Sequence, residues 1–217
     1  MIDEVDVYKN LLLKHPFTCL VAGATSSGKS TIVSELINNM SSLTVPDIPI
    51  PVRVTWCLGS ANDAPTVTST HVALDVIYGR PPEEPDCDIL VIDDQMTDMA
   101  DSKHMCDLFS KHSHHKKMSI FFIVQNLFFQ GKHMRNIALN SHYLILTKSR
   151  RDISQVKRLG IQLFGKGDFF FDAYKKAVLD REYGYLFVDL SPSTDERFRL
   201  RSHILPSEYP ITIYYPK

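Results

Sequence analysis

The sequence predicts an α/β fold in which a mostly parallel central sheet is flanked by helices. Apolar runs of strand length, rich in β-branched and aromatic residues, alternate with segments whose apolar residues recur at helical spacing. The composition, with 44% hydrophobic residues and a net charge of −1, is typical of a globular protein. Because 217 residues can bury one substantial core, we expect a single domain spanning residues 1–217.

Each expected strand depends on one apolar run. In chain order these runs are TCLVA, VRVTWC, DILVID, SIFFIVQ, YLILT and GYLFVDL, at residues 18–22, 52–57, 88–93, 119–125, 143–147 and 184–190. Helical periodicity predicts helices at residues 29–40, 101–112, 153–164 and 169–180. The alternation of the two element types favours parallel pairing, because parallel strands need long crossover connections.

Three segments lack a clear period. Residues 1–14 are expected to form an N-terminal helix or arm. Residues 61–86 carry few periodic apolar residues and several prolines, so we expect a surface insertion with at most one short helix. Residues 206–217 contain prolines that exclude a central strand, and a C-terminal edge strand or arm is expected there.

The octet GATSSGKS, residues 23–30, joins the first strand to the first helix. It fits the pattern G-x-x-x-x-G-K-[ST], in which backbone N–H groups and the positive end of the helix surround phosphates. Lys29 is expected to reach the β- and γ-phosphates, and Ser30 to bind Mg²⁺. The residues expected to cradle the nucleotide are Gly23, Ala24, Thr25, Ser26, Ser27, Gly28, Lys29, Ser30 and Thr31.

A second acidic element follows in CDILVIDDQM. Four apolar residues lead into Asp93 and Asp94, which resembles a Walker B strand. We expect Asp93 to hold Mg²⁺ together with Ser30, and Asp94 to polarise the attacking water. The tandem acid favours hydrolysis of the nucleotide, since a small-molecule kinase has no need of a water-polarising carboxylate at this position.

The third element is MSIFFIVQNLFF. Its apolar run ends in Gln125 and Asn126, and polar side chains at the carboxyl end of a parallel strand face the ligand crevice. If this strand lies between the P-loop strand and the Walker B strand, Gln125 comes near the γ-phosphate. That strand order defines the additional-strand, RecA/FtsK-like branch of P-loop NTPases.

The chain resembles the DNA-packaging ATPases of the FtsK/HerA superfamily, in the branch found in poxviruses, adintoviruses and Maverick/Polinton elements. The resemblance is carried by HPFTCLVAGATSSGKS, ILVIDDQM, LFSKHSHHKKMSIFFIVQNLFF, MRNIALNSHYLILTKSRRD and YGYLFVDLSP. It implies an ATP- and Mg²⁺-dependent motor that assembles as a ring and moves double-stranded DNA into a capsid. Capsid or portal proteins are then expected partners. Many members have Asp-Glu where this chain has Asp93-Asp94, so Asp94 has a shorter reach.

A ring motor usually receives an arginine from the neighbouring subunit, which neutralises charge in the transition state. Three arginines are candidates in this chain. Arg135 follows a turn soon after Gln125, while Arg150 and Arg151 directly follow the apolar run YLILT.

Charge is unevenly distributed along the chain. Residues 1–102 contain 5 Lys and Arg against 15 Asp and Glu, whereas residues 103–158 contain 11 against 2. The basic block suits phosphate contacts with DNA, although a solvated surface explains it equally well. No apolar stretch reaches 18 residues and the N-terminus is acidic, so we expect an intracellular protein without a membrane span, present where virions assemble.

Two other functions remain open on sequence grounds. A nucleotide or nucleoside kinase would share the P-loop and the chain length, with the basic stretch KSRRDISQVKR as its lid. A nucleotide-dependent assembly switch would use the basic block to bind a protein partner and would turn over slowly.

Overall fold

The computed structural model describes residues 11–59, 65–93, 108–109, 116–126, 137, 140–151, 153–165, 167–179 and 181–216. The strands of the main sheet are β2 (Thr18–Ala22), β4 (Val52–Leu58), β5 (Val72–Tyr78), β6 (Ile89–Asp93), β7 (Ser119–Val124), β8 (Tyr143–Leu146), β9 (Leu186–Asp189), β10 (Leu200–Ser202) and β11 (Thr212–Tyr214). Two short strands, β1 (Leu13–Lys14) and β3 (Thr44–Val45), pair in parallel with each other.

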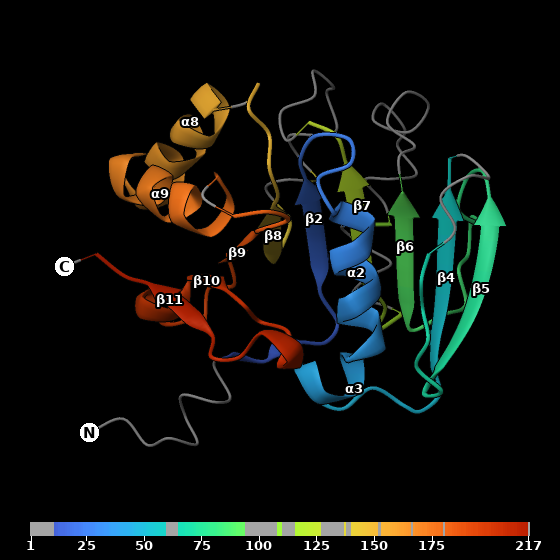
Figure 1. Cartoon of the computed structure of the whole chain (residues 1–217). Helices are drawn as coiled ribbons and strands as arrows, with labels where there is room; N and C mark the ends of the chain where they lie inside the picture. Colours follow the sequence, from blue (N-terminus) through green and yellow to red (C-terminus); the bar gives the residue numbers. More distant parts are fainter. Residues whose placement is uncertain are drawn as a thin grey trace, which may run out of the picture.

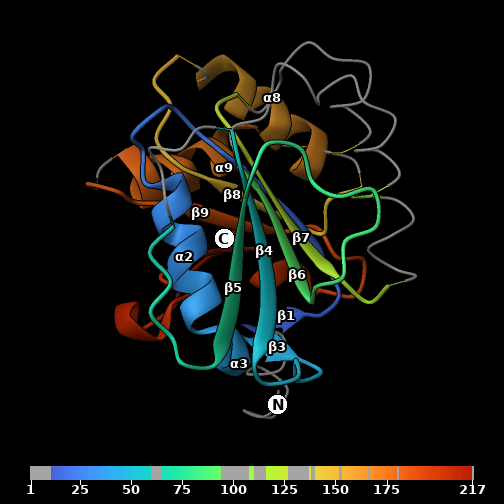
Figure 2. The ribbon, with the colours of Figure 1, turned by 90° about the vertical axis from the view of Figure 1, so that its right-hand side faces the viewer.

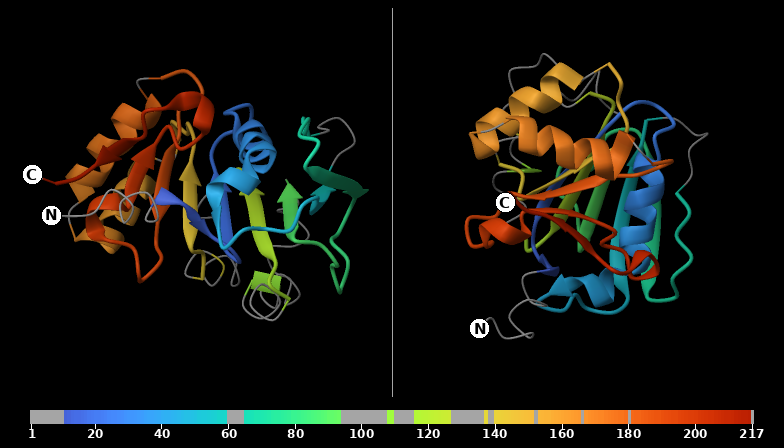
Figure 3. Two further views of the ribbon diagram at one scale, coloured as in Figure 1. Left: turned by 90° about the horizontal axis from the view of Figure 1, so that it is seen from below. Right: turned by 60° about the vertical axis from the view of Figure 1, so that its left-hand side comes forward.

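Within the described residues the main sheet has nine strands in the order β11-β10-β9-β8-β2-β7-β6-β4-β5 (Figure 1). The pairs from β8 to β5 are parallel, and β9, β10 and β11 continue the sheet in antiparallel pairs. Seen from below, β5 and the C-terminal strands lie at opposite ends of the sheet (Figure 3). The mostly parallel sheet predicted from the sequence is confirmed.

The helices cover both faces of this sheet. They are α2 (Lys29–Asn38), α3 (Met40–Leu43), α8 (Ile153–Phe164) and α9 (Gly167–Tyr174), which continues into a π-helical segment, η2 (Lys175–Leu179). Two short 3₁₀ turns, η3 (Glu196–Phe198) and η4 (Pro206–Glu208), flank β10. Figure 2 views the β5 edge of the sheet and shows α2 to the left of the strands. Of the described helices, none is both long enough and apolar enough to cross a membrane.

The core has two halves, one on each face of the sheet. Strand β2 is buried throughout, and its residues alternate between the halves because successive side chains of a strand point to opposite faces. Cys19 and Val21 pack with the apolar residues of α2, whereas Leu20 and Ala22 pack with those of α8 and α9. A strand that is apolar on both faces fits only the interior of a covered sheet.

Most expected elements are found within a few residues of their predicted limits. The helix predicted at residues 29–40 is divided into α2 and α3, and α8 matches its predicted range. The helix predicted at residues 101–112 lies almost entirely outside the described residues, as do residues 1–10 of the expected N-terminal arm. The C-terminal segment contributes β11 as an edge strand.

The expectation for residues 61–86 is wrong in one respect. Instead of irregular chain with a short helix, residues 72–78 form β5, which pairs in parallel with all of β4. Its side chains alternate between partly buried and exposed over most of its length, which is typical of an edge strand covered on one face. The prolines that suggested a loop lie outside this short alternating segment.

Strand β10 was not predicted at all. Its central residue is Arg201, a charged residue that sequence patterns place on the surface. The side chain is instead fully buried, where Nη2 donates to Asp189 Oδ2 at 2.9 Å and Nη1 donates to the Leu11 carbonyl at 2.9 Å. The guanidinium lies 4.7 Å from the centre of the Phe187 ring. Burial lowers the pKa of Arg201, and the Asp189 carboxylate opposes that shift.

We predict that Asp189→Asn destabilises the protein by about 3–5 kcal/mol, because it leaves a buried guanidinium without its carboxylate. Asp86→Asn is the matched control, since the Asp86 side chain is 91% exposed in its ion pair with Arg53 and such pairs contribute about 0–1 kcal/mol. Urea unfolding followed by circular dichroism measures both changes. Equal, small losses in the two variants would contradict the structural role given to the buried pair.

Candidate active site

The octet at residues 23–30 forms a tight loop between β2 and α2. Gly28 has φ 86° and Ser26 has φ 59°, so both adopt the left-handed conformation that turns the chain back on itself. The carbonyl of Gly28 then accepts the first helical hydrogen bond, from the N–H of Ile32 at 2.9 Å. The loop therefore ends directly at the N-terminus of a helix, where backbone N–H groups are available to an anion.

Ser30 and Asp93 meet at the carboxyl edge of the sheet. Ser30 lies in the first turn of α2, Asp93 is the last residue of β6, and Ser30 Oγ donates to Asp93 Oδ2 at 2.8 Å. Asp93 is only 5% exposed. A hydroxyl and a carboxylate are hard oxygen ligands of the kind that Mg²⁺ prefers in nucleotide sites, so this pair fits a magnesium ion.

Lys29 lies over the loop that precedes it. Its ammonium group donates to the carbonyl of Ala24 at 2.8 Å, at the start of the turn. A cation at this place lies beside any anion held by the loop amides, which is the role that the sequence pattern predicts for it.

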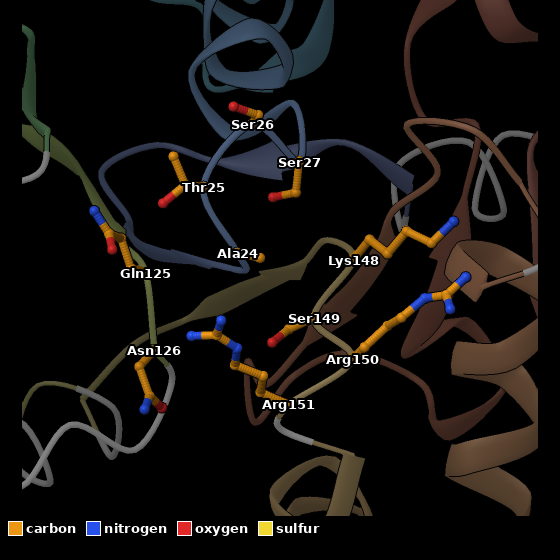
Figure 4. A pocket seen from close by; sticks show the side chains of 10 residues that line it. All are labelled: Ala24, Thr25, Ser26, Ser27, Gln125, Asn126, Lys148, Ser149, Arg150 and Arg151. Carbon is orange, nitrogen blue, oxygen red and sulfur yellow. The ribbon is translucent and has the colours of Figure 1, made fainter.

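Two cavities open at this edge of the sheet. One, of about 650 Å³, is lined by the loop residues Ala24, Thr25, Ser26 and Ser27, by Gln125 and Asn126 after β7, and by Lys148, Ser149, Arg150 and Arg151 after β8 (Figure 4). The other, of about 220 Å³, is lined by Thr25, Ser26, Gly28, Lys29, Ser30, Thr31, Leu58, Gly59, Asp93 and Gln125. Gln125 and the loop border both, so the two cavities meet at the P-loop.

The position of β7 explains why Gln125 reaches this site. Strand β7 pairs with β2 on one side and with β6 on the other, so Ile123 is opposite both Val21 and Asp93. Two residues later the chain leaves the sheet at Gln125, beside the loop. The predicted strand order, with β7 between the P-loop strand and the strand of Asp93, is confirmed.

The loop is also attached to the end of β8. The N–H of Ala24 donates to the carbonyl of Lys148 at 3.1 Å, and the hydroxyls of Ser27 and Thr147 are 2.6 Å apart. A side chain at Gly23 would collide with Thr147 Oγ1, which explains glycine at this position without a positive φ. The octet itself gave no indication that Thr147 would be its partner.

Arg150 and Arg151 line the larger cavity from the same chain as the loop. Figure 4 shows Arg151 extending toward Asn126 and Gln125, while Arg150 extends the other way, alongside Lys148. The structure thus brings two of the three candidate arginines to the chain's own site. Arg135 and Asp94, the expected water-polarising acid, lie outside the described residues.

A tyrosine far along the chain holds the segment that carries these arginines. The hydroxyl of Tyr174, in α9, donates to the Thr147 carbonyl at 3.1 Å and accepts from the Ser149 N–H at 3.2 Å. Tyr174 is fully buried. Sequence reasoning missed this residue, since nothing near it in the chain indicates a contact with the end of β8.

The described basic residues of block 103–158 do not form one patch. Lys116 and Lys117 precede β7 and lie at the amino edge of the parallel sheet, whereas Lys148, Arg150 and Arg151 follow β8 and lie at the carboxyl edge. Lys116 also pairs with Glu84 at 3.6 Å. Two further basic residues of the block, Lys157 and Arg158, lie in α8. Of the basic residues that flank β7 and β8, only those after β8 adjoin the candidate active site.

The strand order, the loop at residues 23–30 and the buried Ser30–Asp93 pair define a P-loop NTPase fold. Among solved structures, the chain is similar to the genome packaging NTPase B204 from Sulfolobus turreted icosahedral virus 2 in its complex with AMPPCP. The TM-score is 0.53 at 13% identity, covering 93% of this chain and 98% of that one.

The sulfate complex of the same protein gives a TM-score of 0.53 at 12% identity, covering 93% of this chain and 97% of that one. B204, the DNA-packaging ATPase from Sulfolobus turreted icosahedral virus, gives 0.52 at 11% identity, covering 94% and 99%. These likenesses show the shared fold. No family model and no curated protein sequence matches the chain.

We predict that Tyr174→Phe destabilises the protein by about 1–3 kcal/mol, because two buried hydrogen-bonding groups lose this partner. The segment carrying Arg150 and Arg151 would then be less well held, and nucleotide turnover should fall together with stability. Thermal unfolding and steady-state phosphate release measure the two effects. Tyr78→Phe is the control, since Tyr78 is 60% exposed on β5; equal behaviour of the two variants would contradict the prediction.

Proposed function

We propose that this protein is an ATP-driven DNA-packaging motor, which hydrolyses ATP with Mg²⁺ to move double-stranded viral DNA into a capsid. The observation that carries the hydrolytic part is the Ser30–Asp93 hydrogen bond beside the P-loop. A hydroxyl and a buried carboxylate at this edge would hold Mg²⁺, which would neutralise charge on the phosphates. We treat residues 1–217 as one ATPase domain.

Each site residue has one task in this proposal. The loop amides and Lys29 hold the phosphates, and Ser30 and Asp93 hold Mg²⁺, which neutralises charge on the transferred phosphoryl group. Asp94, directly after Asp93, takes the proton of the attacking water. Gln125 contacts the γ-phosphate and orients that water, since it borders both cavities of the site.

The packaging role is supported by two independent observations. One is the sequence resemblance to FtsK/HerA packaging ATPases of the poxvirus, adintovirus and Maverick/Polinton branch. The other is the fold shared with B204 over nearly the whole length of both chains. The proposed partners are double-stranded DNA, further copies of this chain in a ring, and capsid or portal proteins at the site of virion assembly in the host nucleus or cytoplasm.

We predict that Lys29→Ala abolishes ATP hydrolysis, because the phosphates lose their main cation. Phosphate release should be measured with and without linear double-stranded DNA, at two salt concentrations. The wild-type rate should rise with DNA, and the rise should shrink as salt increases, because contacts to phosphates are screened and the release of counterions from DNA becomes less favourable.

Two outcomes would count against the motor. An unchanged rate in folded Lys29→Ala would remove the active-site assignment altogether. Turnover that is indifferent to DNA in the assembled protein would favour the switch, and phosphate transfer to a nucleoside or nucleotide would favour the kinase.

The arginine that acts at the site can be identified by mixing subunits. We propose Arg150 or Arg151 for this task, with Arg135 as the third candidate. Each is replaced by Ala and mixed with Lys29→Ala subunits, which supply intact arginines but no working P-loop. Recovery of ATP hydrolysis in the mixture would indicate an arginine donated between neighbouring subunits. An arginine that serves its own chain's cavity would show no recovery, and that result for all three would contradict donation between subunits.

A further inference from the structure

The loop before β9 lies at the same edge of the sheet as the P-loop. Strand β9 runs antiparallel to β8 with Leu186 opposite Leu146, so the residues that lead into β9 lie at the carboxyl end of β8. Since β8 and β7 flank β2 on opposite sides, this loop is on the far side of the P-loop from Asp93. It is therefore separated from Asp93 by the P-loop but close to the start of α2.

Tyr183 in this loop lies beside the P-loop, near Gly28. A Cβ added to Gly28 would lie 3.5 Å from Tyr183 Cδ1 and 3.8 Å from Tyr183 Cβ, which is ordinary van der Waals contact. The side chain is nevertheless 68% exposed. An exposed aromatic ring beside a phosphate-binding loop offers a face on which a flat ligand can stack.

The backbone of Tyr183 is held in an unfavourable conformation. Its φ is 53°, in the left-handed region, which residues with a side chain rarely adopt. The next residues explain how the conformation persists. A side chain at Gly184 would collide with the carbonyl of Ala177, and the Tyr185 hydroxyl bonds to Glu208 and accepts from the N–H of Ile204 at 2.9 Å. The backbone that carries the Tyr183 ring is thus fixed by the packing and hydrogen bonds of the two residues that follow it.

A cavity of about 120 Å³ lies beside this ring. Its lining includes Arg181, Tyr183 and His203, and the Arg181 guanidinium and the His203 imidazole contact each other across it. The cavity offers a second polar surface next to the aromatic face, as a flat heteroaromatic group with hydrogen-bonding edges would require.

From these contacts we propose that Tyr183 is the stacking platform for the nucleobase of the bound nucleotide. The proposal rests on the nucleotide site proposed above. Because Ser30 and Asp93 mark the metal-bound end of the triphosphate, the ribose and base leave the loop on the opposite side, where Tyr183 lies against Gly28. Stacking uses the π-face that every base has, so Tyr183 favours large bases and does not distinguish adenine from guanine.

The test compares ligands with and without a base. Binding of MgATP, MgGTP and inorganic tripolyphosphate to the full chain is measured by calorimetry for wild type, Tyr183→Ala and Tyr183→Phe. Tyr183→Ala should weaken both nucleotides about tenfold or more, since loss of one base–aromatic stack has an effect of this size. Tyr183→Ala should leave the affinity for tripolyphosphate unchanged, and Tyr183→Phe should bind all three ligands with the wild-type affinity. Tyr78→Ala, at an exposed tyrosine of β5, is the control.

The outcomes separate this inference from the proposed function. Nucleotide binding unchanged in Tyr183→Ala, or an equal loss of tripolyphosphate, would overturn the stacking role while leaving the phosphate site intact. Wild-type protein that binds neither ATP nor tripolyphosphate would overturn the nucleotide site and the stacking role with it. Lys29→Ala, which should lose all three ligands, shows that binding occurs at the P-loop.

Discussion

The hydrogen bond between Ser30 and Asp93 depends on a strand that contributes neither residue. Strand β7 lies between β2 and β6, so the P-loop and the acidic residue are separated by one strand rather than adjacent. That strand is apolar on both faces and fully buried, and both cores pack against it. The extra strand also places Gln125 between the loop and Asp93. The hydrolytic geometry therefore depends on burial of a continuous apolar run, because a strand that is apolar on both faces needs a position in the covered interior of the sheet.

The P-loop is held from both neighbouring strands. The N–H of Gly23 donates to the Val124 carbonyl at 3.3 Å, at the end of β7, and the N–H of Ala24 donates to the Lys148 carbonyl, at the end of β8. Through Tyr174 the second attachment continues to α9. A shift of the loop on phosphate binding would therefore act on the arginine segment after β8 and on the helix behind it. These contacts form a continuous chain of hydrogen bonds from the P-loop to α9.

Sequence reasoning succeeded for the features that a short run of consecutive residues encodes. The octet at residues 23–30 and the apolar runs ending in Asp93 and Gln125 each carry their own signal. The order of their strands was a hypothesis taken from a branch of the P-loop fold, and the structure has that order. Sequence reasoning failed where a residue owes its role to distant partners. Strand β10 could not be predicted, because its central residue, Arg201, is charged. A charged residue indicates a surface position unless a buried partner such as Asp189 is known. Thr147, Tyr174 and Tyr183 contact the site from far along the chain, and no local pattern marks them.

The residues proposed for the two ends of the nucleotide differ in how far the sequence alone reveals them. The phosphate end is served by one contiguous loop and two strand ends, since a charged group needs amides, a cation and a carboxylate at fixed positions. The base end is served by Tyr183, whose placement requires the antiparallel return of β9 and close packing at Gly184. Stacking tolerates variation in the base and in the exact position of the ring. In this proposal the antiparallel extension β9-β10-β11 also serves the base, because β9 begins at the edge where the P-loop lies and Tyr183 directly precedes it.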